Sequence, residues 1–234
     1  MAQPIISILT PTYQEKRIRH AVESIFAQDF TDWELIIIDD GSGDDYYREF
    51  LAPFKGEEKI TVLRAAKHIG LPGSLNLGLV VARGVVIARQ DADDVSAPPR
   101  LRKQLCHMID ANLDGVSCQF DYLPDSPDHP PRWDLPTDPE VVKRGIFDGN
   151  VAGGGGYSMC RAAAIRDLGG WKEIFSYAED WALWIDMVVR GFPIGIVDEI
   201  LYHIWWKHAE RPEPYLESQA RGVEQVREYY KEMR

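Results

Sequence analysis

The sequence contains few cysteines, and their spacing excludes two classes of protein. Only 3 occur in 234 residues: Cys106, Cys118 and Cys160. They are too few and too scattered for the disulfide framework of a small secreted protein, and they lack the spacing of a metal site. We therefore expect a reducing compartment, with each cysteine serving as a small buried apolar residue.

Basic residues and long apolar runs are also scarce. The chain has 26 Lys and Arg against 37 Asp and Glu, a formal net charge of −11, whereas nucleic-acid binding needs a basic face. No apolar segment approaches the ~18 residues that span a bilayer. The N-terminus lacks a basic region and is interrupted by Pro4 and Pro11, unlike a signal peptide. We expect a cytoplasmic protein with no nucleic-acid partner and no transmembrane segment, although one small anionic ligand remains compatible with this charge.

In its first part, the sequence alternates short apolar runs with segments of helical periodicity. The apolar runs cover residues 5–10, 33–39, 59–65 and 85–90, and the helical segments cover 18–28, 46–54 and 72–83. Strand and helix alternating over this distance predict βαβ units and an α/β fold with a Rossmann-like, mainly parallel sheet flanked by helices. In such sheets, ligands bind beyond the carboxyl ends of the strands.

The second part of the chain is less regular. We predict a helix at 96–112, opened by Ser96 and Pro98, and later helices at 178–192 and 214–234. Between them lie predicted strands at 115–122 and 157–161, an extended segment at 193–206, a loop at 123–139 and a flexible or close-approach segment at 151–156.

No internal repeat and no clear linker interrupts this pattern. We therefore expect one domain over residues 1–234, with a first half at 1–95, a second half at 96–212 and a C-terminal helix at 213–234. That helix is expected to pack either on its own domain or on a partner subunit, which would make the protein a homo-oligomer.

Carboxylates gather where the predicted strands end. Asp39 and Asp40 follow the second strand, and Asp91, Asp93 and Asp94 follow the fourth. Like charges about 4 Å apart cost on the order of 1 kcal/mol in water and more in a partly buried cleft. A hard divalent cation, Mg²⁺ or Mn²⁺, prefers oxygen ligands and would relieve that repulsion. The alternative is a solvated loop in which one aspartate caps the next helix.

Four stretches resemble, in their order, the successive motifs of family 2 glycosyltransferases. They are SILTPTYQE (7–15), WELIIIDDGSGDD (33–45), HIGLPGSLNLGLVVARGVVIARQDADD (68–94) and YAEDWALWIDMVVRGF (177–192). The resemblance implies an inverting enzyme with the GT-A fold, whose first half binds a nucleotide sugar and whose smaller second region binds the acceptor. It further implies transfer from a UDP- or dTDP-sugar to a hydroxyl of a glycan-type acceptor, in polysaccharide assembly, with Mn²⁺ or Mg²⁺ as cofactor.

The resemblance also assigns roles at the nucleotide side. The residues carried over are Pro11, Thr12, Tyr13, Glu15, Asp39, Asp40, Arg89 and Asp91. The first three would line the nucleobase pocket and the fourth would lie near the ribose. Asp39 would read the base, and Asp40 would support that loop. The alternatives are a packed aromatic residue for Tyr13 and a plain turn for the two aspartates.

For the metal, the resemblance points to a D-x-D pair. Of Asp91 and Asp93, one would contact the ribose and the other the metal, and Asp94 is an alternative ligand. His208 falls where some relatives place a metal-binding histidine, while a single histidine near a C-terminal segment is usually structural.

Glu179 and Asp180 form a second acidic site. By resemblance Asp180 is the general base, and Glu179 supports it or orients the acceptor. A carboxylate with the ordinary pKa of ~3.9 is ionised at neutral pH and can accept a hydroxyl proton. The alternative is a helix start whose dipole favours acids. Trp181 and Trp184 are expected in the core rather than in an acceptor platform.

Four cations lie close to these motifs in sequence, and they could meet a departing diphosphate. They are Lys67, His68, Arg83 and Arg89. Arg89 lies one strand step from Asp91 on the same side, so it either neutralises phosphate or pairs with an aspartate.

The sequence departs from the family pattern at several positions. Gln14 and His68 stand where asparagine is usual, and glycines at 153–156 replace bulkier polar residues, which leaves the acceptor open. The Q-x-x-R-W motif and membrane helices of processive synthases do not occur, which favours single transfer. Two other functions remain: an inactive carbohydrate- or nucleotide-binding protein, and a sugar-1-phosphate nucleotidyltransferase. The latter predicts a glycine-rich loop after the first strand, where residues 10–17 contain no glycine.

Overall fold

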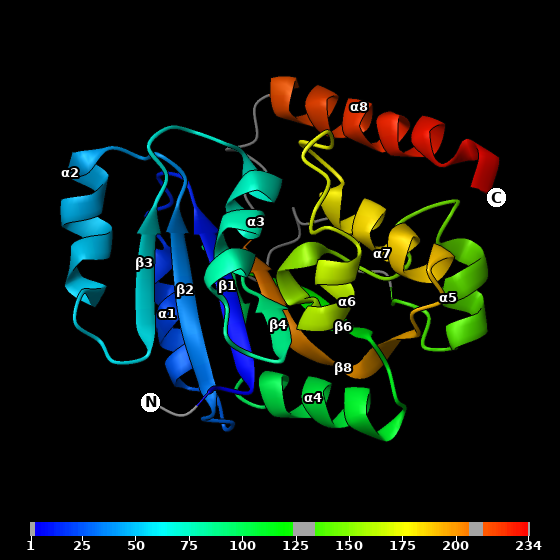
Figure 1. Ribbon diagram of the computed structural model, residues 1–234, viewed down its shortest axis with the longest axis horizontal. Helices are drawn as coiled ribbons and strands as arrows, with labels where there is room; N and C mark the ends of the chain where they lie inside the picture. Colours follow the sequence, from blue (N-terminus) through cyan, green and yellow to red (C-terminus); the bar gives the residue numbers. More distant parts are fainter. Residues whose placement is uncertain (1–2, 124–133, 206–212, 234) are drawn as a thin grey trace.

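The computed structural model describes residues 3–123, 134–205 and 213–233. A single sheet runs through it in the order β3-β2-β1-β4-β7-β6-β8-β5, with helices packed around it (Figure 1). The strands are β1 (Ile6–Thr12), β2 (Trp33–Asp39), β3 (Ile60–Arg64), β4 (Val86–Arg89), β5 (Val95–Ser96), β6 (Gly115–Leu123), β7 (Met159–Arg161) and β8 (Ile194–Trp205). The α/β prediction is confirmed.

Helices connect these strands. The α-helices are α1 (Ile18–Phe26), α2 (Asp44–Tyr46), α3 (Leu71–Val81), α4 (Arg100–Asp110), α5 (Pro139–Gly145), α6 (Ala162–Asp167), α7 (Glu179–Val189) and α8 (Glu213–Tyr229). A π-helical turn, η1 (Tyr47–Leu51), and a 3₁₀ turn, η2 (Ala52–Phe54), prolong α2; further 3₁₀ turns are η3 (Gly155–Tyr157) and η5 (Lys231–Met233).

The first half of the sheet is parallel. β1 pairs in parallel with both β2 and β4, and β2 pairs in parallel with β3. Every residue of β1 and β2 is buried, as expected of strands covered on both faces. Thr12 lies opposite Asp39, and Leu9 lies opposite Arg89. The carboxyl ends of these strands therefore meet at one edge, where the sequence placed the ligand site.

The antiparallel pairings of the sheet begin at β7. This short strand lies between β4 and β6 and is antiparallel to both, whereas β6 and β8 are parallel to each other. β5 closes the far edge, antiparallel to β8. The second half of the chain thus extends the same sheet. Among the strands of the described residues, only β7 and β5 run against the others, so the prediction of a mainly parallel sheet is confirmed.

The structure corrects the start of the helix predicted at 96–112. Ser96 belongs to β5 opposite Tyr202, and its N–H donates to Ser24 Oγ at 3.1 Å. The N–H of Ala97 likewise donates to Leu201 O at 2.9 Å. Because Ser24 on α1 and Leu201 on β8 accept from these backbone groups, the helix begins at Arg100, and Ser96 does not cap it.

Cysteine burial follows the prediction in two cases of three. Cys118 and Cys160 are buried, but Cys106 is exposed on α4. That prediction was wrong because Cys106 falls on the polar face of the helix, between the buried positions Gln104 and Met108.

The C-terminal helix packs on its own chain. α8 lies alongside α7 in Figure 1, and Val226 and Tyr230 are buried beneath it. Tyr230 Oη donates a hydrogen bond to Asp186 Oδ1 on α7 at 2.7 Å. This matches the first of the two expected arrangements, while a homo-oligomer remains a prediction. Within the described ranges, no helix is both long enough and apolar enough to cross a membrane.

Candidate active site

A small hollow of about 170 Å³ opens at the carboxyl ends of β1 and β4. Its lining is Pro11, Thr12, Tyr13, Glu15, Leu71, Arg89, Asp91, Ala92 and Asp93. Seven of these nine are residues that the sequence assigned to the nucleotide or the metal. Two strand ends that are far apart in sequence thus supply one concave surface.

Hydrogen bonds hold the end of β1 in place. Thr12 Oγ1 lies 2.7 Å from Tyr46 Oη, which donates to the backbone oxygen of Glu15, also at 2.7 Å. The carboxylate of Glu15 accepts from Arg17 N at 2.9 Å and from Arg17 Nε at 3.0 Å. Tyr13 is 50% exposed, so it is not a core aromatic residue. Its ring centroid lies 4.4 Å from that of His68.

Asp39 and Asp40 lie below this surface and do not line the hollow. Asp39 accepts from Ser42 N at 2.9 Å and pairs with Arg64 Nε at 3.3 Å. Asp40 accepts from the N–H groups of Ile69 at 2.7 Å and Gly70 at 3.0 Å. These bonds fix the loop that leads into α3. Base reading by Asp39 stays a prediction.

The three aspartates after β4 have different environments. Asp91 Oδ1 and Oδ2 accept from Arg89 Nε at 2.7 Å and Nη2 at 3.2 Å. Asp93 lines both the small hollow and a larger cavity beside it. Asp94 is buried and accepts from Trp205 N at 2.8 Å. Burial raises the pKa of Asp94 well above its ordinary value, and the charges of Asp93 and Asp91 raise it further.

Arg89 connects this acidic group to α7. Its Nη1 donates to Glu179 Oε1 at 2.7 Å, so the buried guanidinium bridges Asp91 and Glu179. Burial raises the pKa of Glu179 to about 7, with Arg89 acting to lower it and Asp180 to raise it. Of the two roles foreseen for Arg89, pairing with a carboxylate is the one formed here.

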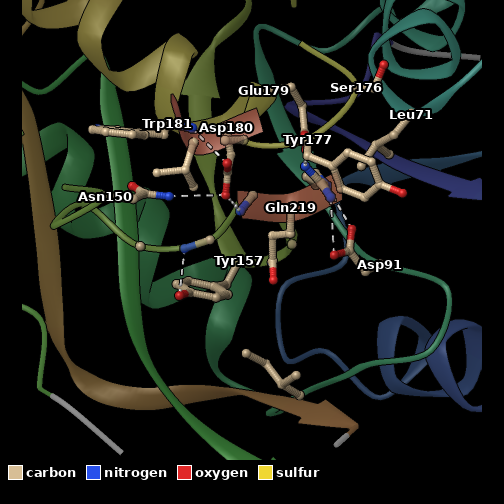
Figure 2. Close-up of a pocket in the computed structure, with 18 of the residues that line it drawn as sticks. Leu71, Asp91, Asn150, Tyr157, Ser176, Tyr177, Glu179, Asp180, Trp181 and Gln219 are labelled. Carbon is tan, nitrogen blue, oxygen red and sulfur yellow. Dashed lines mark hydrogen bonds and ion pairs between the residues drawn. The ribbon is translucent and has the colours of Figure 1, made fainter. Parts of the chain in front are cut away.

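The larger cavity, about 1,320 Å³, brings Asp180 into the same space as Asp91 and Asp93. Asp180 Oδ2 accepts from Gly155 N at 2.9 Å and Asn150 Nδ2 at 3.2 Å, and its Oδ1 accepts from Trp181 N at 2.7 Å. Figure 2 shows this carboxylate held from several sides at the cavity wall. Burial raises its pKa, opposed by Arg89 and by the backbone N–H groups.

Comparison with known proteins identifies the family of this chain. The family model described as glycosyl transferase family 2 matches residues 7–169. The chain belongs to that family. EpsE of Bacillus subtilis, provisionally named a glycosyltransferase, is 31% identical over 207 residues, covering 86% of this chain and 73% of EpsE. The uncharacterized glycosyltransferase MJ1057 of Methanocaldococcus jannaschii is 32% identical over 210 residues, covering 86% of this chain and 70% of MJ1057.

Solved structures establish the fold of this family 2 glycosyltransferase. TarS of S. aureus in complex with UDP-GlcNAc superposes with a TM-score of 0.73 at 18% identity, covering 95% of this chain and 70% of that one. The mannosyltransferase PcManGT of Pyrobaculum calidifontis, solved with GDP-Man and Mn²⁺, gives a TM-score of 0.70 at 17% identity, covering 96% and 63%. The predicted GT-A fold is confirmed.

The glycine run at 153–156 is the part of the transferase site that sequence reasoning left undefined. A Cβ on Gly155 would lie 2.0 Å from Arg89 Nη1, and one on Gly156 would lie 2.7 Å from Tyr202 Oη and 2.8 Å from Asp91 Oδ2. Gly153 has a φ of +91°. The run is therefore a segment at which the backbone closely approaches other groups, which was one of the two expectations for residues 151–156. The role of Asn150, in contrast, had no sequence signal.

Other expected residues lie elsewhere in the transferase. Arg83 pairs with Glu34 near the start of β2, at the opposite end of the sheet from the site. Trp181 and Trp184 are buried, and their indole N–H groups donate to Ile146 O and Gly153 O, which confirms the core prediction. His208 lies outside the described residues.

The carboxylates of the transferase site can hold a hard cation only together with oxygen atoms of a bound ligand. Within the described ranges, no group of three or more His, Cys, Asp or Glu side chains is placed to hold a metal ion. Asp91 and Asp93 nevertheless offer carboxylate oxygens at the cavity wall, and Mg²⁺ is commonly bound by one or two carboxylates together with phosphates and water. Burial is the main cause of the raised pKa of Asp94, and the charges of Asp93 and Asp91, which a cation would offset, raise it further.

Proposed function

We propose that this glycosyltransferase is an inverting, metal-dependent enzyme that transfers a sugar from a UDP- or dTDP-sugar to a hydroxyl of a glycan-type acceptor. One observation carries the proposal: a single cavity is lined by Asp91 and Asp93 on the donor side and by Asp180 on the other. A leaving group and an attacking hydroxyl can therefore meet within one shared cavity.

The donor side supports a nucleoside diphosphate. The half-exposed ring of Tyr13 offers a stacking face for a base, and Glu15 lies in the same hollow. The complexes of TarS with UDP-GlcNAc and of PcManGT with GDP-Man place nucleotide sugars in proteins of this fold. We assign the corresponding hollow here to the nucleoside.

Asp93, with Asp91 beside it, would hold Mn²⁺ or Mg²⁺, and the bound ion would act as a Lewis acid toward the diphosphate. Arg89 is not available to the phosphates without loss of its pairs to Asp91 and Glu179. We therefore give Arg89 a supporting role.

Asp180 is proposed as the general base. Each carboxylate oxygen has two lone-pair sites. Oδ2 uses both for Gly155 and Asn150, and Oδ1 uses one for Trp181. The remaining site on Oδ1 is the position at which Asp180 would take the acceptor proton. As the acceptor oxygen bonds to the anomeric carbon, the bond from that carbon to the diphosphate breaks on the opposite face, which inverts the configuration.

Calorimetric titration tests the donor half of this proposal. UDP, dTDP and GDP are titrated with and without Mn²⁺ into the natural protein and into Asp93→Ala. We expect UDP or dTDP to bind in a metal-dependent manner, and this binding to be lost in the variant. Absence of binding by all three nucleotides would overturn the proposal and favour an inactive binding protein.

Asp180→Asn tests the chemistry. We expect this variant to keep nucleotide affinity but to lose about 10²- to 10⁴-fold in transfer rate, the usual worth of a general base. The anomeric configuration of the product, read by NMR from the coupling constant, decides between inversion and retention.

A further inference from the structure

The helix α8 presents two adjoining faces to the rest of the molecule. One face packs against the domain through Gly222 and Val226, and through Tyr230 just after the helix, all three buried. The second lines the large cavity through Gln219, Ala220, Val223, Glu224 and Arg227. Their spacing places these five side chains on a single stripe. α8 is thus both a packed element and a wall of the cavity.

This wall lies next to the proposed base. A Cβ on Gly222 would lie 2.7 Å from Tyr177 Cβ and 2.8 Å from Tyr177 O, so α8 presses directly on the loop before α7. The next residue, Ala178, has a left-handed φ of +62°, which is strained for alanine. Gln219, Asp180 and Tyr177 all line the large cavity (Figure 2).

The polar groups of the stripe are planar and nearly balanced in charge. Gln219 offers an amide, Glu224 a carboxylate and Arg227 a guanidinium, each able to bond two neighbouring hydroxyls at once. Arg227 Nη1 lies 3.9 Å from Glu224 Oε2, so their charges offset each other. An anionic group on the ligand would be unfavourable here, because the carboxylate of Asp180 lines the same cavity.

We propose that this stripe of α8 is an acceptor subsite for an uncharged saccharide, with Gln219 and Arg227 as its specificity-determining contacts. The proposal rests on the glycosyltransferase function given above, which requires an acceptor beside Asp180. The cavity exceeds the 300–1,000 Å³ typical of a single small ligand, which leaves room for an acceptor beside the donor.

The same helix supplies matched controls. Arg221 and Gln225 are exposed and do not line the cavity. Saturation-transfer NMR is recorded with UDP and Mg²⁺, because Mn²⁺ is paramagnetic and would broaden the signals. The probes are the methyl glycosides of glucose, galactose and mannose, the methyl glucuronide as an anionic counterpart, and a short serine peptide. Gln219→Ala and Arg227→Ala are compared with Gln225→Ala and Arg221→Ala, all four checked by thermal melting.

We expect at least one neutral glycoside to bind the natural protein, and its affinity to fall about three- to tenfold in Gln219→Ala and Arg227→Ala only. Equal behaviour of the two pairs, no glycoside binding, or binding of the glucuronide or peptide alone would overturn the subsite. Binding of UDP, dTDP and GDP, measured calorimetrically on the same samples, separates this failure from failure of the proposed function: only if none of the three nucleotides binds the natural protein is the function itself wrong.

Discussion

Arg89 joins the two sides of the site through three hydrogen bonds. Its partners are Asp91, two residues away, and Glu179, 90 residues away. A buried guanidinium fixed between two carboxylates sets the distance between the proposed donor side and the proposed acceptor side. The geometry of the D-x-D segment and of the α7 start therefore depends on one side chain.

Gly155→Ala tests this dependence. The added Cβ would lie 2.0 Å from Arg89 Nη1, the atom that donates to Glu179, so this pair must be disturbed. We expect the transfer rate to fall about 10²-fold, the cost of a misplacement of roughly 1 Å. Gly73→Ala is the control, because its Cβ would make ordinary contacts of 3.4 to 3.5 Å with Ile69. Equal steady-state rates in the two variants would contradict the bridge.

Glu179 should make stability depend on pH. Its pKa is about 7 in the folded protein against an ordinary 4.5, so the folded state holds a proton that the unfolded state releases within that interval. The stabilising contribution of Glu179 to the free energy of unfolding is therefore complete below pH 4.5 and is lost as the pH rises toward 7. Glu179→Gln should remove this loss, on the order of 1–3 kcal/mol. Denaturant unfolding across that range measures it, and parallel curves for both proteins would refute it.

Sequence motifs predicted the acidic residues of the site but not the groups that hold them. An aspartate after a strand, or at a helix start, is visible as a local pattern. The Arg89–Glu179 pair and the Asn150–Asp180 bond join positions 90 and 30 residues apart, and no local pattern encodes such a pairing. The four consecutive glycines were the one visible signal, and the contacts of Gly155 explain them.

At the scale of elements, α4 is tied to the sheet by Arg100, which is fully buried. Its guanidinium donates to Arg89 O at 2.6 Å, Ser96 Oγ at 2.7 Å and Gln104 Oε1 at 3.0 Å. The end of β4, the strand β5 and the first turn of α4 thus meet at one side chain.

Arg100→Ala should be strongly destabilising. It leaves several buried oxygens without donors, and we expect the free energy of unfolding to fall by about 3 kcal/mol or more. Arg102→Ala on the same helix removes an exposed pair with Asp29 and should leave stability nearly unchanged. Urea denaturation of both variants provides the measurement, and similar midpoints would disprove the structural role.

Element prediction succeeded where burial imposed a pattern. The apolar runs of β1, β2 and β4 and the periodicity of α1 and α7 are strong signals because whole faces are buried. α3 is apolar on most sides, and its helix is predicted from Pro72 and Gly84 instead. β5 has two residues and pairs with a strand about a hundred positions later, so Ser96 and Pro98 suggested a helix start instead. α6, with six residues, is too short to show a period.

For the whole molecule, donor binding should appear as thermal stabilisation. A ligand at about 100 times its Kd that binds only the folded state adds about 2.7 kcal/mol, or roughly 5–10 °C in Tm for a chain of this size. We expect this shift with UDP or dTDP plus Mn²⁺, and its loss on addition of EDTA. An unchanged shift in EDTA would contradict metal dependence.

The order of strands in the sheet also has a consequence for synthesis on the ribosome. β1 to β4 come from the first ninety residues, so the nucleotide half can pair its strands while the remainder is still being translated. β8, in contrast, lies between β6 and β5, and Trp205 is the residue that bonds Asp94. The nascent chain therefore exposes its acidic cluster until β8, the last strand of the described residues, has emerged, and the large cavity gains its α8 wall only after that.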